Sequence, residues 1–291
     1  MRRVLVVKLL IAIVLGFLAW ETPALAATQA AIITFDGSPA DYQLIRRSQR
    51  QPVKFLTGLR AGDRLKVLMP GRGLVYRQPD GRLERLRFEH GEVQIESERS
   101  AVTIFGNIFA MIGDKLTRHR GRDGSVSARG PRHQQGALKL SHPDLAKGRA
   151  QVEAGRRPFA VAWTGGTRPF RVTVSDRQGG VVVDEDNIQT WQLIVGGAGV
   201  RLGAQRYTVM VRGATGAPVA GSFLGVPAAT PRPLSAKGDD LDAAAAVLHA
   251  AELLASGRHR TFEAYNTLAP FYDSDRTARE FMHAMADKEL P

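Results

Sequence analysis

Cysteine is absent from the 291-residue chain. This absence excludes a disulfide scaffold, a cysteine-ligated zinc site, an iron–sulfur cluster, a thiol nucleophile and a lipid-modified N-terminal cysteine. The sequence also lacks a phosphate-binding loop, a dinucleotide fingerprint, a nucleophile elbow and a zinc-helix motif. Together these absences favour a non-enzymatic protein without a cofactor.

Long hydrophobic runs are lacking as well, with one short exception at the N-terminus. The uncharged apolar run Leu9 to Trp20 has 12 residues, whereas a membrane-spanning helix needs about 20. It follows the basic Arg2 and Arg3 and precedes a small-x-small cleavage site formed by Ala24, Ala26 and Ala27. The pattern predicts a signal peptide over residues 1–26, cleaved after Ala26.

The signal peptide predicts a protein exported to a bacterial periplasm, because eukaryotic secreted proteins commonly carry disulfides. Secretion, or anchoring by an uncleaved signal, is the alternative. No transmembrane segment is expected after processing. The formal net charge of +12, from 40 Lys and Arg against 28 Asp and Glu, favours acidic partners.

Much of the positive charge lies in residues 115–140, among glycines and with a single acidic residue. The candidate anion-binding residues are Lys115, Arg118, Arg120, Arg122, Arg129, Arg132 and Lys139. No aromatic side chain separates them, so nucleic acid is not expected as a partner. We predict a basic, Gly-rich linker or loop over 115–150 that binds an envelope protein or an anionic envelope surface, with a solvated linker as the alternative.

Residues 27–114 predict a small β barrel or roll closed by a helix with an apolar face between Ile104 and Leu116. Short β-rich segments such as 31–35, 53–56 and 64–68 are separated by turn residues. Residues 59–65 (LRAGDRL) and 80–83 (DGRL) resemble the FecR-type periplasmic β domain, over about 53–96. This resemblance implies a sensory or signalling module.

Residues 151–228 predict a β-sandwich, because apolar residues alternate in short strands such as 159–163 and 170–174. Gly165-Gly166 and Gly196-Gly197 are expected to form hairpin turns. The stretch 202–209 (LGAQRYTV) is similar to the tyrosine corner of immunoglobulin-like and fibronectin-like modules, a resemblance that covers about 157–226. It implies that Tyr207 hydrogen-bonds back to the preceding loop.

A Pro-rich linker at 229–238 precedes a helical tail at 239–291. Asp240 and Thr261 are candidate caps of a helical hairpin, and a third helix is expected after Asp273. One such unit cannot bury its apolar face alone. We therefore expect the tail to dock on the sandwich, on a partner or on a second copy.

Three further groups of residues have alternative interpretations. The loop Asp184 to Asp186 is either a polar hairpin loop or a calcium site. Trp163 and Trp191 are either core residues or exposed platforms for a ligand. The histidines at positions 119, 133 and 142 are irregularly spaced, which argues against a metal site.

The predicted fold class is mainly β with an α-helical tail. The predicted function is an exported, non-enzymatic binding or scaffolding protein of the bacterial cell envelope. A FecR-type sensory module is the alternative, and an envelope hydrolase without a recognisable motif is a third possibility. The sequence does not specify the ligand, the partner or the oligomeric state.

Overall fold

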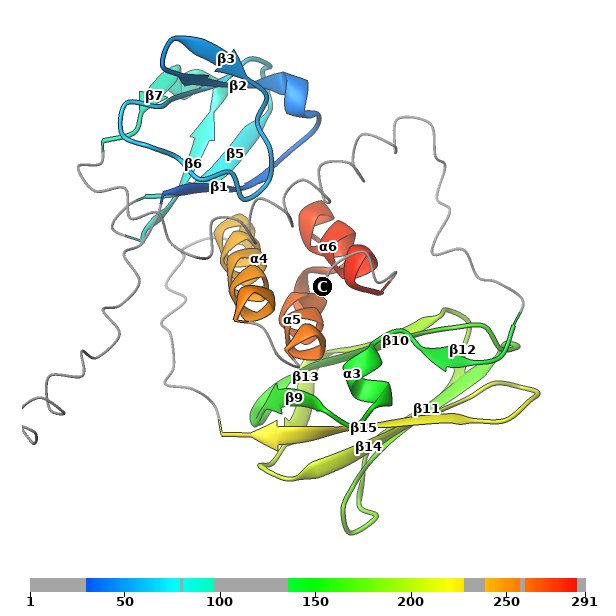
Figure 1. The fold of residues 1–291 in the computed structure, drawn as a ribbon. Coiled ribbons are helices and arrows are strands. Elements are labelled where there is room, and N and C mark those ends of the chain that lie inside the picture. The colour runs from blue at the N-terminus through cyan, green and yellow to red at the C-terminus, as the bar shows by residue number, and fades with distance from the viewer. Residues whose placement is uncertain (1–29, 79–80, 97–135, 228–238, 257–259, 287–291) are drawn as a thin grey trace, which may run out of the picture.

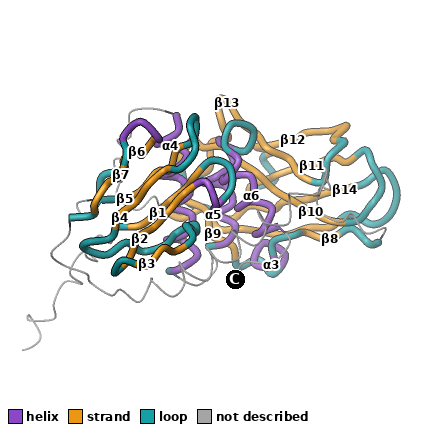
Figure 2. The backbone as a smooth tube through the Cα atoms, turned by 90° about the horizontal axis from the view of Figure 1, so that it is seen from above, coloured by secondary structure: helices purple, strands orange, loops and turns teal. Residues whose placement is uncertain are grey.

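The computed structural model describes residues 30–78, 81–96, 136–227, 239–256 and 260–286 (Figure 1). The described chain forms two β-rich units with a group of helices between them, as Figures 1 and 2 show from two directions. The predicted class, mainly β with a helical tail, is confirmed. The signal peptide with its cleavage site, the helix expected near 104–116 and the 229–238 linker lie outside the described residues.

The first unit, here called the N-terminal β unit, covers residues 30–96. Its strands and 3₁₀-helices are β1 Ala31–Phe35, η1 Pro39–Asp41, β2 Tyr42–Arg46, β3 Gln49–Gln51, β4 Arg64–Val67, β5 Gly73–Arg77, β6 Leu83–Arg87, η2 Phe88–His90 and β7 Glu92–Gln94. They form the sheets β1-β5-β6 and β3-β2-β4-β7, and among the described residues neither sheet closes into a barrel. The sheets enclose a core that includes Phe35, Leu65 and Leu74.

The expected strand at 53–56 is not formed, although its apolar residues are buried. Val53, Phe55 and Leu56 are each at most 2% exposed and lie in an irregular segment between β3 and β4. Leu56 has a φ of 53°, which takes the backbone out of the extended region. The segment therefore fills the core with side chains without joining a sheet ladder.

The second unit, here called the sandwich, consists of two sheets with orders β13-β10-β8 and β12-β11-β14-β15-β9. Its elements are β8 Lys139–Leu140, α3 Pro143–Ala146, β9 Ala150–Glu153, β10 Gly155–Thr164, β11 Phe170–Asp176, β12 Val181–Ile188, β13 Gln192–Leu202, β14 Arg206–Arg212 and β15 Val219–Val226. Alternate residues of both sheets, such as Val161, Val172 and Val209, share one core. The period-two pattern of the sequence thus reports the buried face of each strand.

The sandwich begins earlier in the chain than the sequence indicates. Residues 139–150, assigned above to the basic connector, form β8, α3 and the start of β9. Leu140 and Leu145 enter the sandwich core. A two-residue strand and a four-residue helix are too short to show a periodic pattern, so the composition of the segment dominated the prediction.

The Gly196-Gly197 pair does not form the expected hairpin turn but lies within β13. The pairing register of β10 and β13 shifts from Arg157↔Val200 to Phe159↔Val195, so β13 bulges here. Gly199, at φ +67°, lies so near β10 that a Cβ would be 2.6 Å from the Arg157 carbonyl oxygen. Gly165-Gly166 does occupy the expected turn, between β10 and β11.

The hydrogen bond implied by the tyrosine-corner resemblance is present. The Gly203 N–H donates to the Tyr207 hydroxyl over 2.6 Å, and the Tyr207 side chain is buried. The ring stacks on Phe223 of β15 at a centroid distance of 5.1 Å. This contact ties the loop before β14 to the sandwich core.

The tail comprises α4 Asp239–Ala255, α5 Thr261–Leu268, η3 Ala269–Phe271 and α6 Arg276–Ala286. Thr261 is the first residue of α5 and not its cap; Arg260 is the N-cap and makes no side-chain cap bond. The third helix, α6, begins after Asp273 as expected, and Asp275, just before its first residue, accepts the Ala278 N–H at 2.7 Å. The tail packs on both β units, with α4 against β1 and β6 and α5 against β9 and β10.

Candidate anion-binding cleft

A cleft of about 410 Å³ opens beside the β2–β3 hairpin of the N-terminal β unit. We call it the arginine cleft; its lining residues are Arg46, Arg47, Gln49, Gln51 and Arg60. The volume lies within the range of small-molecule sites, roughly 300–1,000 Å³. The lining has no carboxylate, histidine or hydroxyl side chain and is dominated by hydrogen-bond donors.

The turn of the hairpin sets the position of the cleft side chains. Arg47 and Ser48 have φ values of 50° and 64°, and they join strands paired as Arg46↔Gln49. Positive φ at both central residues is the geometry of a type I′ turn, which ordinarily favours Asn-Gly. Such a conformation costs about 1–3 kcal/mol for each non-glycine residue, and backbone strain of this kind clusters at functional sites.

Strand alternation sorts the hairpin side chains onto two faces. Residues directly opposite each other in an antiparallel pair project to the same side. Arg46 and Gln49 therefore share a face, and Gln51 follows on that face two residues later. Arg50, opposite Ile45, projects from the other face and does not line the cleft.

A buried carboxylate fixes one wall of the arginine cleft. The Arg46 guanidinium donates to Asp63 at 3.0 Å from Nε and 2.6 Å from Nη2, and Nη2 also donates to the Gly58 carbonyl at 2.8 Å. The Arg60 N–H donates to the same carboxylate at 2.8 Å. Asp63 is 2% exposed, so it anchors the turn at 60–63 and neutralises Arg46.

The remaining positive charge of the cleft is uncompensated. Arg47 and Arg60 are exposed, and within the described part of the chain neither forms an ion pair. The side-chain amides of Gln49 and Gln51 likewise have no hydrogen-bond partner among the described residues. A guanidinium presents a planar fork of donors that matches carboxylate and phosphate oxygens. The arrangement can therefore bind an oxyanion and hydrogen-bond to polar groups next to it.

The residues of the arginine cleft were not predicted from the sequence. Most of the basic residues predicted to bind anions lie outside the part of the chain that the structure describes. Lys115, Arg118, Arg120, Arg122, Arg129 and Arg132 lie outside the described residues. Lys139 is exposed in β8, where it pairs with Thr164, and so belongs to the sandwich and not to the cleft unit. The adjacent Arg46-Arg47 and the turn residues 60–63 were the available signals.

The acidic residues at 184–186 belong to β12 and do not form a loop. Arg171 donates to Asp184 from Nε at 2.8 Å and from Nη2 at 2.6 Å, and this pairing lowers the Asp184 pKa. Both oxygens of this carboxylate are thus engaged by a cation. In the described part of the chain no three His, Cys, Asp or Glu side chains cluster as a metal site would require.

Trp163 is a core residue, as one of the two interpretations above has it. Its side chain is 1% exposed and meets Phe170 edge to face at 5.3 Å. Trp191 is half-buried against the same core, and the Arg168 guanidinium lies 3.6 Å from its ring centroid. A cation over the ring face occupies the surface that a stacked ligand would use.

No protein-family model and no curated protein matches the chain. Among solved structures, one similar to part of it is CopC from Methylosinus trichosporium OB3b, with 21% identity over 29% of this chain and 90% of that chain and a TM-score of 0.23. A TM-score this low carries nothing over from CopC. Within the described residues, no helix has both the length and the apolar character needed to cross a bilayer.

Proposed function

We propose that the protein is an exported, non-enzymatic binding protein of the bacterial cell envelope that holds a small oxyanion in the arginine cleft. The observation that carries the proposal is the pair of uncompensated guanidiniums, Arg47 and Arg60, beside two unpaired side-chain amides in one cleft. The ligand class is a phosphorylated or carboxylated molecule with further polar groups, of which an acidic sugar is an example.

The chemistry of the cleft supports binding more than turnover. Guanidinium and amide groups recognise anions, but neither accepts a proton near neutral pH or acts as a nucleophile. The hairpin holds Arg46 and Gln49 in a fixed register, and Asp63 holds Arg46 in place. A site prepared before the ligand arrives loses less entropy on binding.

The test compares ligand binding by the mature chain with binding by an Arg47→Gln/Arg60→Gln variant, using calorimetry at low ionic strength. The probes are inorganic phosphate, glucose 6-phosphate and glucuronate, with glucose as the neutral probe. A hydrogen bond to a charged group contributes about 1.5–3 kcal/mol. Each lost arginine should therefore weaken binding of an anionic probe by about tenfold or more.

Arg50→Gln is the matched control, because Arg50 lies on the same hairpin but projects from its other face. It should leave the affinity within about twofold, since the remaining effect is screened long-range charge. If the double variant binds the anions as well as the parent chain, the ligand is held elsewhere, the arginine-rich stretch from Lys115 to Arg132 being the next candidate. If no anionic probe binds at millimolar concentration, the proposed function is wrong.

A further inference from the structure

One histidine is completely buried where the tail meets the sandwich. His142 is 0% exposed and precedes α3 as its N-cap residue. Its ring meets Tyr265 of α5 edge-on at a centroid distance of 4.5 Å and lies 5.4 Å from Phe262 of the same helix. Phe262 itself enters the sandwich core. His142 therefore lies directly under the helix that attaches the tail to the sandwich.

The surroundings of His142 suit the neutral imidazole only. Neither Nδ1 nor Nε2 has a hydrogen-bond partner among the described residues. A buried charge without a partner is strongly unfavourable. Burial lowers the pKa of His142 to about 4, and the nearby carboxylate of Asp144 opposes this shift.

The other charged groups around His142 are already paired. Asp144 lies 3.5 Å from Arg149, and on α5 Glu263 lies 2.6 Å from Arg157. On β8 Lys139 is exposed, and β15 contributes no titratable side chain. No carboxylate is therefore available beside the ring to hold an imidazolium in the closed interface.

Glu263 responds to acid in the opposite sense. Burial raises the pKa of its carboxyl, while Arg157 and the Glu153 N–H oppose the shift. A raised carboxyl pKa means that the folded state binds the proton more tightly than the unfolded state, so this group contributes more stability as the pH falls. Of these two buried groups, His142 is the one whose protonation weakens the interface.

We propose that His142 makes the α5–sandwich contact acid-sensitive, so that proton uptake separates α5 from the sandwich while α4 and α6 stay on the N-terminal β unit. An exported protein experiences the pH outside the cytoplasm, and this contact would convert a fall in that pH into an uncoupling of the two β units. The histidines near the other contact surface of the tail, His249 and His283, are partly exposed.

The size of the effect follows from the two pKa values. In the open form His142 titrates near its ordinary value of 6.5, and in the closed form near 4. The open form binds the extra proton in this window, so the closed form is favoured at and above pH 6.5 and loses this advantage as the pH falls toward 4. His142 alone should shift the opening equilibrium by up to about tenfold per pH unit, and by about 30-fold at pH 5 relative to pH 7.5. Proton uptake by Glu263 acts in the opposite direction, so about 30-fold is the upper limit of the net shift.

A reporter of the closed contact is already present in the backbone. The Ala160 N–H donates to the Asn266 side-chain oxygen of α5 at 2.7 Å, so its hydrogen exchange requires α5 to leave. We would measure the protection factor of this amide by NMR at pH 7.5 and pH 5, corrected for intrinsic exchange. In the parent chain it should fall by severalfold, up to about 30-fold, while amides in the centre of β11 and β14 keep their protection.

Variants that cannot take up a proton provide the decisive comparison. In His142→Leu, and in His142→Gln should Leu not pack, Ala160 protection should not fall between pH 7.5 and pH 5. His90→Gln, which removes an exposed histidine of the N-terminal β unit, should behave as the parent chain. A constant protection factor in the parent chain, an equal fall in His142→Leu, or a simultaneous loss of protection in β11 and β14 would each overturn the proposal. Binding to the arginine cleft does not enter this measurement.

Discussion

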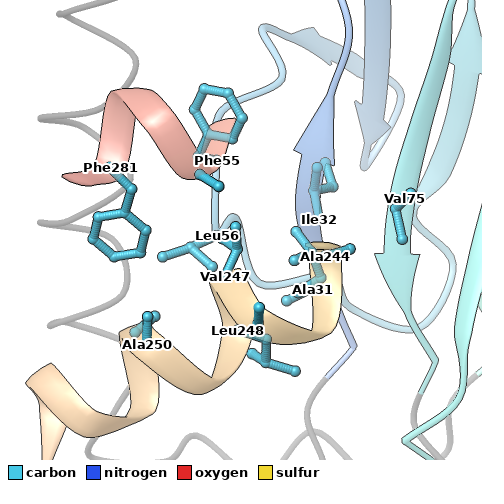
Figure 3. Close-up of a cluster of buried hydrophobic side chains, with 14 of the residues drawn as sticks. Ala31, Ile32, Phe55, Leu56, Val75, Ala244, Val247, Leu248, Ala250 and Phe281 are labelled. Atoms are coloured by element: carbon cyan, nitrogen blue, oxygen red, sulfur yellow. The ribbon is translucent and has the colours of Figure 1, made fainter. Parts of the chain in front are cut away.

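The tail meets the two β units through interfaces that differ in how many polar contacts they contain. Against the N-terminal β unit, α4 and α6 present apolar side chains, and Figure 3 shows Val247, Leu248 and Phe281 facing Ile32 and Leu56. Its polar contacts include a buried hydrogen bond of 2.5 Å between Thr34 and Thr277 and an ion pair between Arg77 and Glu252, 3.5 Å apart, at the edge. This interface is a continuation of the β-unit core.

Against the sandwich, α5 inserts the apolar Phe262 into the core and adds polar side chains that are almost fully buried. The Asn266 side chain accepts the Ala160 N–H at 2.7 Å and donates to the Ala160 carbonyl at 3.2 Å, as a neighbouring strand would. Glu263 pairs with Arg157 at 2.6 Å and accepts the Glu153 N–H at 3.1 Å. These contacts satisfy backbone groups of β9 and β10 that no strand satisfies.

The difference between the interfaces shows how attachment and orientation are divided. Apolar packing is strong but non-directional, and it accepts side chains of similar volume. Hydrogen bonds to a strand form in one register only, and leaving such groups unpaired is costly. Apolar packing therefore contributes attachment at both interfaces, and the hydrogen bonds of Asn266 and Glu263 fix where α5 lies along β10.

The largest effect is expected from shortening a side chain in the apolar interface. Phe281 is 0% exposed, and Phe281→Ala should destabilise the chain by about 3–5 kcal/mol, because it removes apolar contacts and leaves a cavity. Urea unfolding of the mature chain at pH 7.5 measures the change. Phe88→Ala is the matched control, since Phe88 is 40% exposed and its truncation should change stability by less than about 0.5 kcal/mol. Equal losses in the two variants would contradict the description of this interface.

A smaller effect is expected from the polar contacts, but a substitution that keeps the side-chain volume should not restore stability there. Asn266→Ala leaves the Ala160 N–H and carbonyl without a partner, which should cost about 1–3 kcal/mol. Asn266→Leu has a similar volume but cannot form the two hydrogen bonds, so it should not restore stability. Urea midpoints of the two variants test this expectation.

The corresponding volume-preserving change in the apolar interface is Leu248→Met. It should cost less than about 1.5 kcal/mol, because apolar side chains of similar size repack. If Asn266→Leu is as well accepted as Leu248→Met, the polar contacts do not determine the position of α5 and the contrast between the two interfaces fails.

The sequence predicted those parts of the fold that depend on local patterns. The alternation in β11 and β14 reports which face is buried, whatever that face packs against. The docking of the tail on both β units could not be read in this way. The residues of α4 between Ala243 and Leu254 are buried on almost every side, and such a helix has no single apolar face that identifies its partner.

The sequence did not predict the arginine cleft, because its turn lacks the usual sequence signal. Its turn contains Arg47 and Ser48 at positive φ, where the sequence shows none of the Asn-Gly or Asp-Gly dipeptides that mark a type I′ turn. Arg60 joins the cleft only because Asp63 binds Arg46 across 17 positions of sequence. Contacts of that kind depend on tertiary structure, whereas the basic connector was predicted from its composition alone.

The smallest effect is expected at the edge of the apolar interface. Arg77 and Glu252 have side chains that are 23% and 29% exposed and lie 3.5 Å apart, so water and salt screen the pair. A double-mutant cycle with Arg77→Ala and Glu252→Ala should give a coupling free energy below about 1 kcal/mol, falling further as salt is added. The same cycle with Arg157→Ala and Glu263→Ala should give a larger coupling that salt changes little, because Glu263 is only 1% exposed and loss of one partner leaves a buried charge. A coupling at Arg77–Glu252 that equals or exceeds the one at Arg157–Glu263 would show that the two interfaces do not differ in how they use charge.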